Sequence, residues 1–331
     1  LSLDRFWNFS RGGIVNFRTG LRDAVSGVEQ TRSRMMEYDQ LLVWAVLSLM
    51  LIGLVMVYSA SITLADGPKY ANYSSNYFLI RHLISLVIAI AVGIWAFKIP
   101  TKVWDRYSPV IFGFTVILLI LVLIPGIGKG VNGARRWIPL GLMNFQPSEL
   151  MKFTAVIFAA SYTVQRQEYL HSFSKGMLPM GIAVALVGGL LMKEPDMGAF
   201  VVVALIAFGI LFLGGINAKL FGGLIVVGLL SGAAMIALSP FRRGRMLAFM
   251  DPWQVDNAAN KGYQLTHSLM AFGRGEWFGT GLGGSVEKLH YLPEAHTDFI
   301  MAVIGEELGF VGVVVMIFLF YWIVRRAFMI G

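Results

Sequence analysis

The sequence predicts an all-α protein, a polytopic bundle of membrane-spanning helices. Hydrophobic residues make up 56% of the 331 residues and charged residues only 14%, whereas soluble domains are about a quarter charged. The apolar residues form continuous stretches rather than an alternating pattern, which favours helices over the strands of a membrane barrel. This composition excludes a soluble enzyme and a disordered chain. Because cysteine is absent, thiol, disulfide and cysteine–metal chemistry are excluded as well.

Eight apolar stretches are predicted to span the membrane, some of them only marginally long enough. They cover residues 41–58, 82–97, 109–124, 150–164, 177–192, 199–213, 220–238 and 299–324. Residues 1–40 are rich in arginine and lack the apolar core of a signal peptide, so they are predicted to form a cytoplasmic tail. Residues 41–331 then form one transmembrane domain, which includes a large outer loop at residues 239–298.

The distribution of basic residues predicts a cytoplasmic N-terminus, because short cytoplasmic loops accumulate lysine and arginine. The same bias explains the net charge of +8, and no nucleic-acid partner is predicted. Two outer segments, residues 125–146 and 239–298, carry basic residues against this bias. They indicate either an anionic partner such as a phosphate or an ordinary solvated loop. These outer cations include Lys129, Arg136, Arg242, Arg245 and Lys288.

Ionisable residues inside spans are costly and therefore candidates for function. Glu149 and Lys152 are three residues apart and are predicted to pair on one helix face. Glu306 and Glu307 are consecutive and cannot face the same way, so at least one needs a partner on another helix or a water molecule.

Two outer segments are predicted to turn sharply. Residues 193–196, with the sequence KEPD, interrupt an apolar run, and their carboxylates either cap the turn or line an outer cleft. Residues 279–284 formally match a dinucleotide-binding glycine motif, but no alternating strand–helix pattern surrounds them. These glycines are interpreted as tight turns. The aromatic residues of the loop at 239–298 indicate that it folds onto the outer face, partly as interfacial helices, or that they form an ordinary interfacial belt.

Asp298 lies directly before the last apolar span. Asp298 or its neighbour Thr297 is expected to cap that helix. A carboxylate at this membrane boundary is also placed to act as a general base on a lipid-linked substrate, and the two roles are compatible. His290, His296 and Asp298 have no strong metal-binding spacing, so no metal site is predicted.

The stretch from residue 291 to residue 309, YLPEAHTDFIMAVIGEELG, resembles the signature of the SEDS family of bacterial shape, elongation, division and sporulation proteins. Further blocks agree with that family in the right order, so the resemblance extends over about residues 36–331. Because Lys288 precedes a complete LPEAHTD string, the chain is most similar to the division type of the family. The other matching blocks lie at residues 58–61, 136–138, 146–150, 195–198, 242–253, 262–275 and 281–285.

The resemblance implies a SEDS-type helix bundle with an expected ten transmembrane helices, of which these residues hold eight. It implies a peptidoglycan glycosyltransferase that polymerises lipid II into β-1,4 glycan strands during cell division. The location would be the bacterial inner membrane at the septum. The partners would be a class B penicillin-binding protein, which is the division transpeptidase, and other divisome proteins. The family's essential aspartate corresponds to Asp298, the expected general base of an inverting reaction.

The resemblance and the outer charges together suggest residues that bind the substrate and its pyrophosphate leaving group. No cofactor is certain, although a divalent cation (Mg or Mn) could share the pyrophosphate. Two alternatives stay open: a lipid II flippase, which would need a polar path through the bundle, and a non-catalytic scaffold that recruits the transpeptidase. The expected substrate-binding residues are Lys129, Arg136, Trp137, Arg242, Arg245, Lys288, Glu294 and His296.

Overall fold

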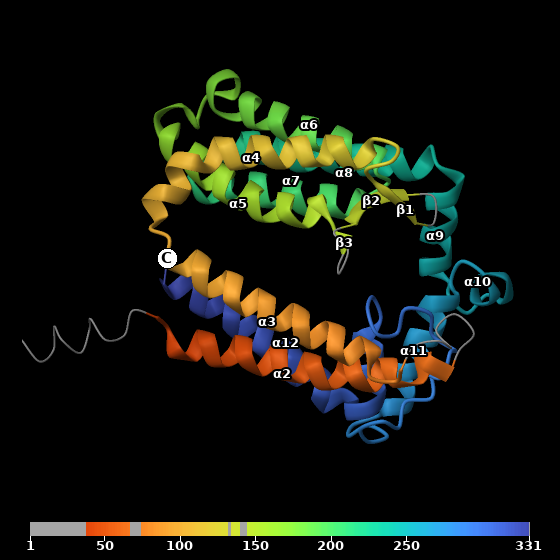
Figure 1. Cartoon of the computed structure of the whole chain (residues 1–331). Helices are drawn as coiled ribbons and strands as arrows, with labels where there is room; N and C mark the ends of the chain where they lie inside the picture. The colour runs from red at the N-terminus through yellow and green to blue at the C-terminus, as the bar shows by residue number, and fades with distance from the viewer. Residues whose placement is uncertain (1–37, 67–73, 132–133, 140–143, 331) are drawn as a thin grey trace, which may run out of the picture. The chain divides into compact units, whose positions relative to one another are not determined.

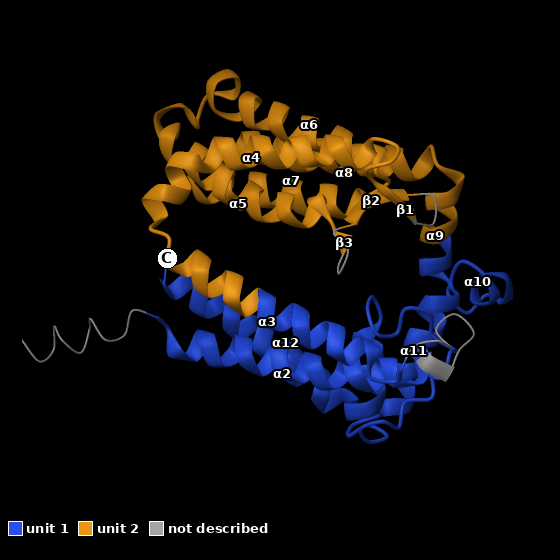
Figure 2. Cartoon of the chain, viewed as in Figure 1, with its two compact units in different colours: residues 1–88, 247–331 blue, residues 89–246 orange. Residues whose placement is uncertain are grey.

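The computed structural model describes residues 38–66, 74–131, 134–139 and 144–330. Nearly all of the predicted N-terminal tail lies outside the described residues. The chain divides into two compact units (Figure 2), of which unit 1 comprises residues 1–88 and 247–331 and unit 2 comprises residues 89–246. Each unit is described by itself.

Unit 1 is built around two long helices, α2 and α12, which run side by side in Figure 1. Helix α3 leads from this unit into unit 2. The helices that lie in unit 1 or begin in it are α2 (Gln40–Ser61), the short 3-10 helix η1 (Ile62–Asp66), α3 (Tyr77–Phe97), α10 (Val255–Ala259), α11 (Tyr263–Gly275) and α12 (Ile300–Ile330).

Helices α2 and α12 are antiparallel and are joined by polar contacts at both ends. At one end Asp39 caps α2 by accepting a hydrogen bond from the Leu42 N–H at 2.8 Å, and it also forms an ion pair with Arg326 of α12. The contact with Arg326 is the main cause that holds the pKa of Asp39 below its ordinary value, and the hydrogen bond from Leu42 adds to it. At the other end Ser59 donates a hydrogen bond to Glu307. Near the Ser59 end the helices also bury apolar side chains, including Met56 of α2 and Val303 of α12.

Helix α11 packs against the first part of α12 at very short range. A Cβ atom at Gly275 would lie 1.8 Å from the carbonyl oxygen of Gly305, and one at Gly305 would lie 2.3 Å from the Phe272 ring. Only glycine allows the two backbones to approach this closely.

Unit 2 contains the remaining helices and one small sheet. Helix α9 leads from it back into unit 1. The elements that lie in unit 2 or begin in it are α4 (Thr101–Leu123), β1 (Lys129–Val131), β2 (Ala134–Pro139), β3 (Asn144–Phe145), α5 (Pro147–Gln165), η2 (Gln167–Tyr169), the π-helix η3 (Phe173–Met177), α6 (Leu178–Lys193), α7 (Met197–Leu213), α8 (Ala218–Ala237) and α9 (Pro240–Met250).

Helices α4, α5, α6 and α7 enclose the core of unit 2. Leu119, Met151, Val187 and Leu191 are fully buried there. The sheet has the order β1-β2-β3 with antiparallel pairing. The sheet lies in an outer segment where no strands were predicted. Its strands are short and lack the alternating pattern that would indicate a strand.

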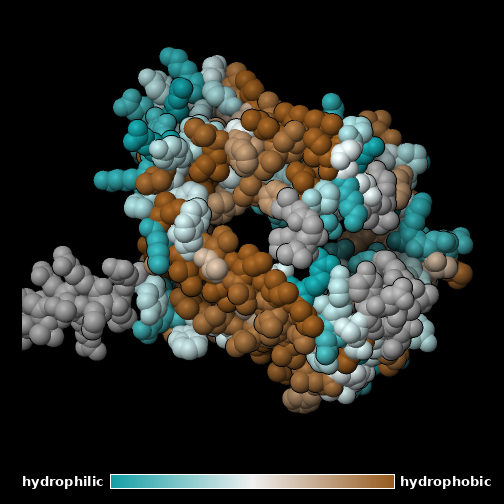
Figure 3. Space-filling model, viewed as in Figure 1, coloured by the Kyte–Doolittle hydropathy of each residue, from teal (hydrophilic) through white to brown (hydrophobic). Residues whose placement is uncertain are grey.

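The structure confirms a helix at each of the eight predicted spans, namely α2 to α8 and α12. Among the described residues, six helices are long and apolar enough to cross a membrane. The other two, α5 and α7, have 19 and 17 residues, and α5 carries the charged residues Glu149 and Lys152. In Figure 3 hydrophobic residues cover the sides of the helices and hydrophilic residues gather toward their ends. The chain is therefore a multi-pass membrane protein.

Replacing Gly275 by alanine should destabilise the protein by about 1–3 kcal/mol, because the added methyl group would force α11 away from α12. Thermal unfolding in detergent measures the change. Gly273→Ala is the matched control in the same helix, since a Cβ there meets nothing within 4 Å; it should be neutral or stabilising by up to about 1 kcal/mol. Equal melting temperatures for the two variants would contradict the close packing of α11 on α12.

Candidate functional site

Residues 276–299 connect α11 to α12 and carry Asp298; this segment is called the strap. It forms successive turns, and Gly279, Gly281 and Gly283 have positive φ values of 80°, 93° and 82°. The prediction of glycine-mediated turns is therefore confirmed. A Cβ at Gly279 would lie 2.1 Å from the carbonyl oxygen of Glu307, so the strap backbone lies directly against α12.

Helix α12 is broken at Gly309, where φ is 68° and ψ is −166°. The continuous apolar run of residues 299–324 predicted an unbroken span here. The strap occupies the break: the N–H of Thr280 donates to the carbonyl oxygen of Glu306 at 2.9 Å, and the N–H of Phe310 donates to that of Glu276 at 2.9 Å. Backbone groups that helix hydrogen bonds would otherwise satisfy are thus paired with the strap.

The Glu306 side chain is completely buried and faces the strap and α11. Its carboxylate accepts hydrogen bonds from the Ser285 hydroxyl at 2.5 Å and from the backbone N–H groups of Val286 and Glu287 at 3.0 and 3.3 Å. Arg274 at the end of α11 contacts it at 3.3 Å. Four donors therefore converge on one buried carboxylate.

Glu307 is also completely buried, and it faces α2. Its carboxylate lies 2.6 Å from the Lys288 ammonium and accepts a hydrogen bond from the Ser59 hydroxyl at 2.7 Å. The two consecutive glutamates have different partners, as the sequence analysis expected. Lys288 is only 4% exposed and directs its charge at Glu307, so its ammonium is enclosed in the protein. Its expected role in binding substrate stays a prediction.

Asp298 lies near the end of the strap, and its side chain is exposed. Among the described residues none forms a hydrogen bond or an ion pair with its carboxylate. Within the described part of the chain neither Asp298 nor Thr297 caps α12, because no backbone N–H of that helix donates to either side chain. The Thr297 hydroxyl donates to Glu294 at 3.2 Å. The capping expectation is therefore not met, and the carboxylate is left accessible to an external proton donor.

The other two strap residues expected to bind substrate lie near Asp298 in sequence but differ in environment. Glu294 is exposed and has a positive φ of 57°. His296 is half-buried and its ring makes an edge contact with Phe78, with 4.9 Å between the centroids. Their predicted role in binding substrate stays a prediction.

One polar contact of the strap could not be predicted from the sequence. His267 of α11 contacts Glu287 through Nδ1 at 2.7 Å. The two residues are 20 positions apart and belong to no helical spacing. Only His267 lies in a matching family block, at residues 262–275, so no sequence signal connects the two.

In unit 2 the Arg136 side chain of β2 binds the turn between α6 and α7. Its Nε donates to the carbonyl oxygen of Glu194 at 2.9 Å, and Nη2 donates to that of Pro195. The predicted sharp turn at residues 193–196 is thus confirmed. Trp137 lies opposite Lys129 across the β1–β2 pair, and Lys129 is exposed. The interaction of these residues with substrate stays a prediction.

Asp196 of the same turn joins three elements. Its carboxylate caps α7 by accepting from the N–H of Ala199 at 3.2 Å. It also accepts from Ser148 at the start of α5 at 3.1 Å and from Gln146 at 3.3 Å. The carboxylate therefore acts as a cap, one of the two predicted roles, and it also fixes the start of α5.

Glu194 differs from Asp196, because its carboxyl group is completely buried and has no hydrogen-bond partner among the described residues. Burial is the main cause that raises its pKa, to about 8, and the nearby charge of Asp196 adds to the effect while Arg136 opposes it. A buried carboxylate without partners is strongly disfavoured, so this group is protonated at neutral pH.

The two predicted cations of α9 differ in environment. Arg242 is half-buried and donates to the carbonyl oxygen of Met235 at 3.4 Å. Arg245 is exposed and lies over the Phe241 ring, 4.7 Å from its centroid. Within the described ranges no three histidine, aspartate or glutamate side chains lie close enough to hold a metal ion.

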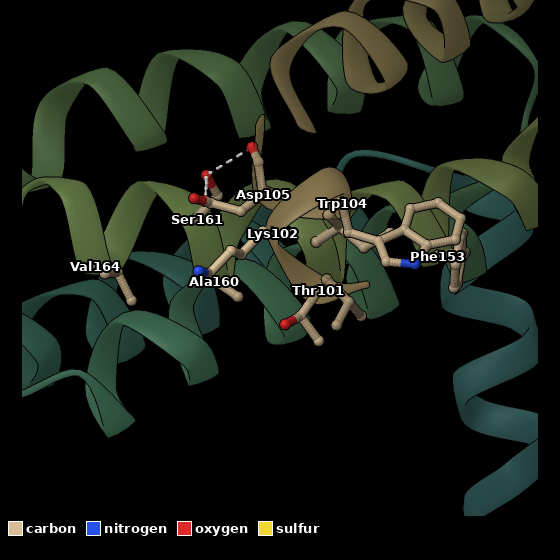
Figure 4. Close-up of a pocket in the computed structure, with 10 residues that line it drawn as sticks. Thr101, Lys102, Trp104, Asp105, Phe153, Ala160, Ser161 and Val164 are labelled. Atoms are coloured by element: carbon tan, nitrogen blue, oxygen red, sulfur yellow. Dashed lines mark hydrogen bonds between the residues drawn. The ribbon is translucent and has the colours of Figure 1, made fainter. Parts of the chain in front are cut away.

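A groove of about 560 Å³ lies between α4 and α5 in unit 2 (Figure 4). Most of its wall is apolar, and the Ser161 hydroxyl donates to Asp105 at 2.6 Å beside it. None of the expected substrate-binding residues lines it. The lining residues are Thr101, Lys102, Trp104, Asp105, Phe153, Val156, Ile157, Ala160, Ser161 and Val164.

These features define a multi-pass helical membrane protein that presents an exposed aspartate on a structured strap. Residues 40–331 match the sequence profile of the FtsW/RodA/SpoVE family, described as cell cycle proteins. The chain belongs to this family.

Two similar relatives have the same curated name, probable peptidoglycan glycosyltransferase FtsW. The relative from Polynucleobacter necessarius subsp. necessarius is 93% identical over 331 residues, which cover 100% of this chain and 78% of the relative. The relative from Burkholderia thailandensis is 61% identical over 312 residues, which cover 94% of this chain and 68% of the relative.

Solved structures have a similar fold. A chain from a study of polymerization and crosslinking by a peptidoglycan synthase complex has a TM-score of 0.68 and 26% identity, and the match covers 88% of this chain and 77% of that one. The rod shape-determining protein RodA of Thermus thermophilus has a TM-score of 0.57 and 23% identity, with 88% and 74% covered. The RodA likeness concerns the fold alone.

Glu194 should make the protein less stable as the pH rises. Its carboxyl holds its proton up to a pH of about 8 in the folded state against an ordinary pKa of 4.5, so the unfolded state releases the proton first and the free energy of unfolding falls across this interval. Glu194→Gln should raise the melting temperature at pH 8.5 and leave it nearly unchanged at pH 5. The exposed residue Glu168 gives the control, Glu168→Gln. Equal shifts at both pH values would contradict the assignment.

Proposed function

We propose that the chain is a peptidoglycan glycosyltransferase of cell division that polymerises lipid II, with Asp298 as its general base. Family membership and the curated names of its relatives support the reaction. The observation that carries the assignment of the base is the exposed Asp298 carboxylate at the start of an apolar helix. A lipid-linked substrate would present its sugars at this boundary between membrane and water.

In the proposed reaction Asp298 takes the proton from a hydroxyl group of the acceptor sugar. The resulting oxygen nucleophile attacks the anomeric carbon of the donor, and the bond from that carbon to undecaprenyl pyrophosphate breaks with its electron pair. The α-linked donor becomes a β-1,4 linkage. Such a direct inversion needs one base and no covalent sugar–enzyme intermediate.

The departing pyrophosphate carries negative charge, which cations would stabilise in the transition state. The exposed residues Lys129 and Arg245 and the half-buried Arg242 are the proposed cations. Arg136 would contribute chiefly by fixing the hairpin that carries Lys129 and Trp137, because its guanidinium binds backbone carbonyls. A divalent cation, Mg or Mn, could share the pyrophosphate.

The proposed setting is the bacterial inner membrane at the division septum, with the N-terminus in the cytoplasm. A class B penicillin-binding protein would crosslink the strands that this chain makes, together with other divisome proteins. The structural match to a chain from a peptidoglycan synthase complex supports such a partner.

No specific observation favours a flippase. Glu149 and Lys152 pair with each other at 2.6 Å, and Glu306 and Glu307 are each compensated by neighbouring groups inside unit 1. The first pair lies within α5, and the two glutamates are bound by α11, α2 and the strap. These charges are therefore explained without a transport path. A non-catalytic scaffold should tolerate Asp298→Asn, whereas an enzyme that uses Asp298 as its base should not.

Asp298→Asn should lower the rate of lipid II polymerisation by about 100-fold or more, because a positioned general base contributes about 10²–10⁴-fold. The measurement uses the full-length protein copurified with its transpeptidase partner and follows glycan chains made from labelled lipid II. Asp256→Asn, which changes an exposed aspartate of α10, should retain the wild-type rate.

Equal glycan products from wild type and Asp298→Asn would remove Asp298 from catalysis. If neither protein makes glycan although both bind the partner, the polymerase assignment fails and the flippase and scaffold hypotheses take its place.

A further inference from the structure

We propose that Lys288 and Glu307 form a positioning pair that fixes the strap, and thereby Asp298, against α2 and α12. The consequence for catalysis rests on the proposed function, whereas the consequence for the strap's structure does not. Neither residue would touch the substrate.

The pair joins three separate parts of unit 1. The Lys288 ammonium lies 2.6 Å from the Glu307 carboxylate and donates to the Ser59 hydroxyl at 3.0 Å. That hydroxyl in turn lies 2.7 Å from Glu307. In addition the Thr63 hydroxyl donates to the backbone carbonyl of Lys288 at 2.9 Å. Helix α12, the segment at the end of α2 and the strap therefore meet at one buried cluster.

Burial indicates that this pair determines position more than stability. Lys288 is 4% exposed and Glu307 is completely buried. Desolvating two charges offsets much of their attraction, so a buried ion pair can often be replaced by neutral residues without loss of stability, whereas removing one partner alone is strongly destabilising. A charge pair that adds little stability still requires one arrangement of the chain, because every other arrangement leaves a buried charge unpaired.

The strap is held from two sides at neighbouring residues. Glu306 binds the backbone N–H groups of Val286 and Glu287, and Glu307 binds the side chain of the next residue, Lys288. Consecutive residues of α12 thus hold consecutive residues of the strap. Because the described partners of the Glu306 carboxylate all lie in α11 and the strap, the side-chain tie from the strap to α2 depends on the Lys288 pair.

Beyond Lys288, turns within the strap lead to Asp298. The N–H of Leu292 donates to the carbonyl oxygen of Glu287 at 2.8 Å, and that of Phe299 donates to Glu294 at 3.2 Å. The exposed Asp298 carboxylate has no partner of its own among the described residues, so the strap sets its position. A base displaced by about 1 Å can lose about 100-fold in rate.

The test compares three variants of the full-length protein bound to its partner. Lys288→Met with Glu307→Gln removes both charges at once and keeps an acceptor for Ser59. Ser59→Ala breaks the tie to α2 and leaves the ion pair. Ser61→Ala is the matched control, because among the described residues this buried hydroxyl forms a hydrogen bond only with the Tyr58 carbonyl of its own helix, at 3.4 Å.

Hydrogen–deuterium exchange, melting temperature and polymerisation kinetics are measured for each protein. In the double variant we expect faster exchange in residues 289–299, a melting temperature close to that of wild type, and kcat lowered by about 10- to 100-fold with KM changed by less than about threefold. Ser59→Ala should show the same changes to a smaller extent. Ser61→Ala should match wild type.

Unchanged exchange in residues 289–299 of the double variant would overturn the proposal, as would an unchanged kcat. A fall in kcat that only parallels a fall in melting temperature would also overturn it, because a merely structural role predicts that result. If wild type makes no glycan, the proposed function fails, and the exchange data alone then decide whether the pair positions the strap.

Discussion

The structure of unit 1 depends on the neutralisation of two consecutive buried carboxylates in α12. A helix in an apolar environment offers no water to Glu306 and Glu307, so each needs donors from the protein itself. Because neighbouring residues point in different directions around a helix, the two carboxylates require partners on two sides. Arg274 and the strap satisfy the first, and Lys288 with Ser59 satisfies the second. The positions of α2, α11 and the strap around α12 follow from this requirement.

The helices could be predicted from the sequence and their polar partners could not. Continuous apolar runs locate each span because the pattern is local. Ser59 and Glu307 are 248 residues apart, and no local pattern connects them. Lys288 shows the same limit: its charge is evident in the sequence, whereas its burial against Glu307 is not. Asp298 was identified from family blocks and its boundary position, and the structure adds that its carboxylate is exposed.

In unit 2 the parts that escaped prediction are those that depend on backbone geometry. The short strands β1 and β2 lack the hydrophobic alternation that would predict a strand. The Arg136 side chain holds their hairpin by donating to carbonyl oxygens, and no sequence pattern predicts such a contact. Similarly, Glu194 and Asp196 are close in sequence and identical in nominal charge. Only the fold distinguishes a buried, protonated carboxyl from one that caps a helix.

The break in α12 has a consequence for how the protein assembles. At membrane depth, irregular backbone is tolerated only when protein groups satisfy it, and here the strap supplies those groups on both sides of Gly309. The strap precedes α12 in the chain and has already been synthesised when α12 emerges from the ribosome. The backbone pairing at the break in α12 is therefore completed only when this helix docks onto the strap.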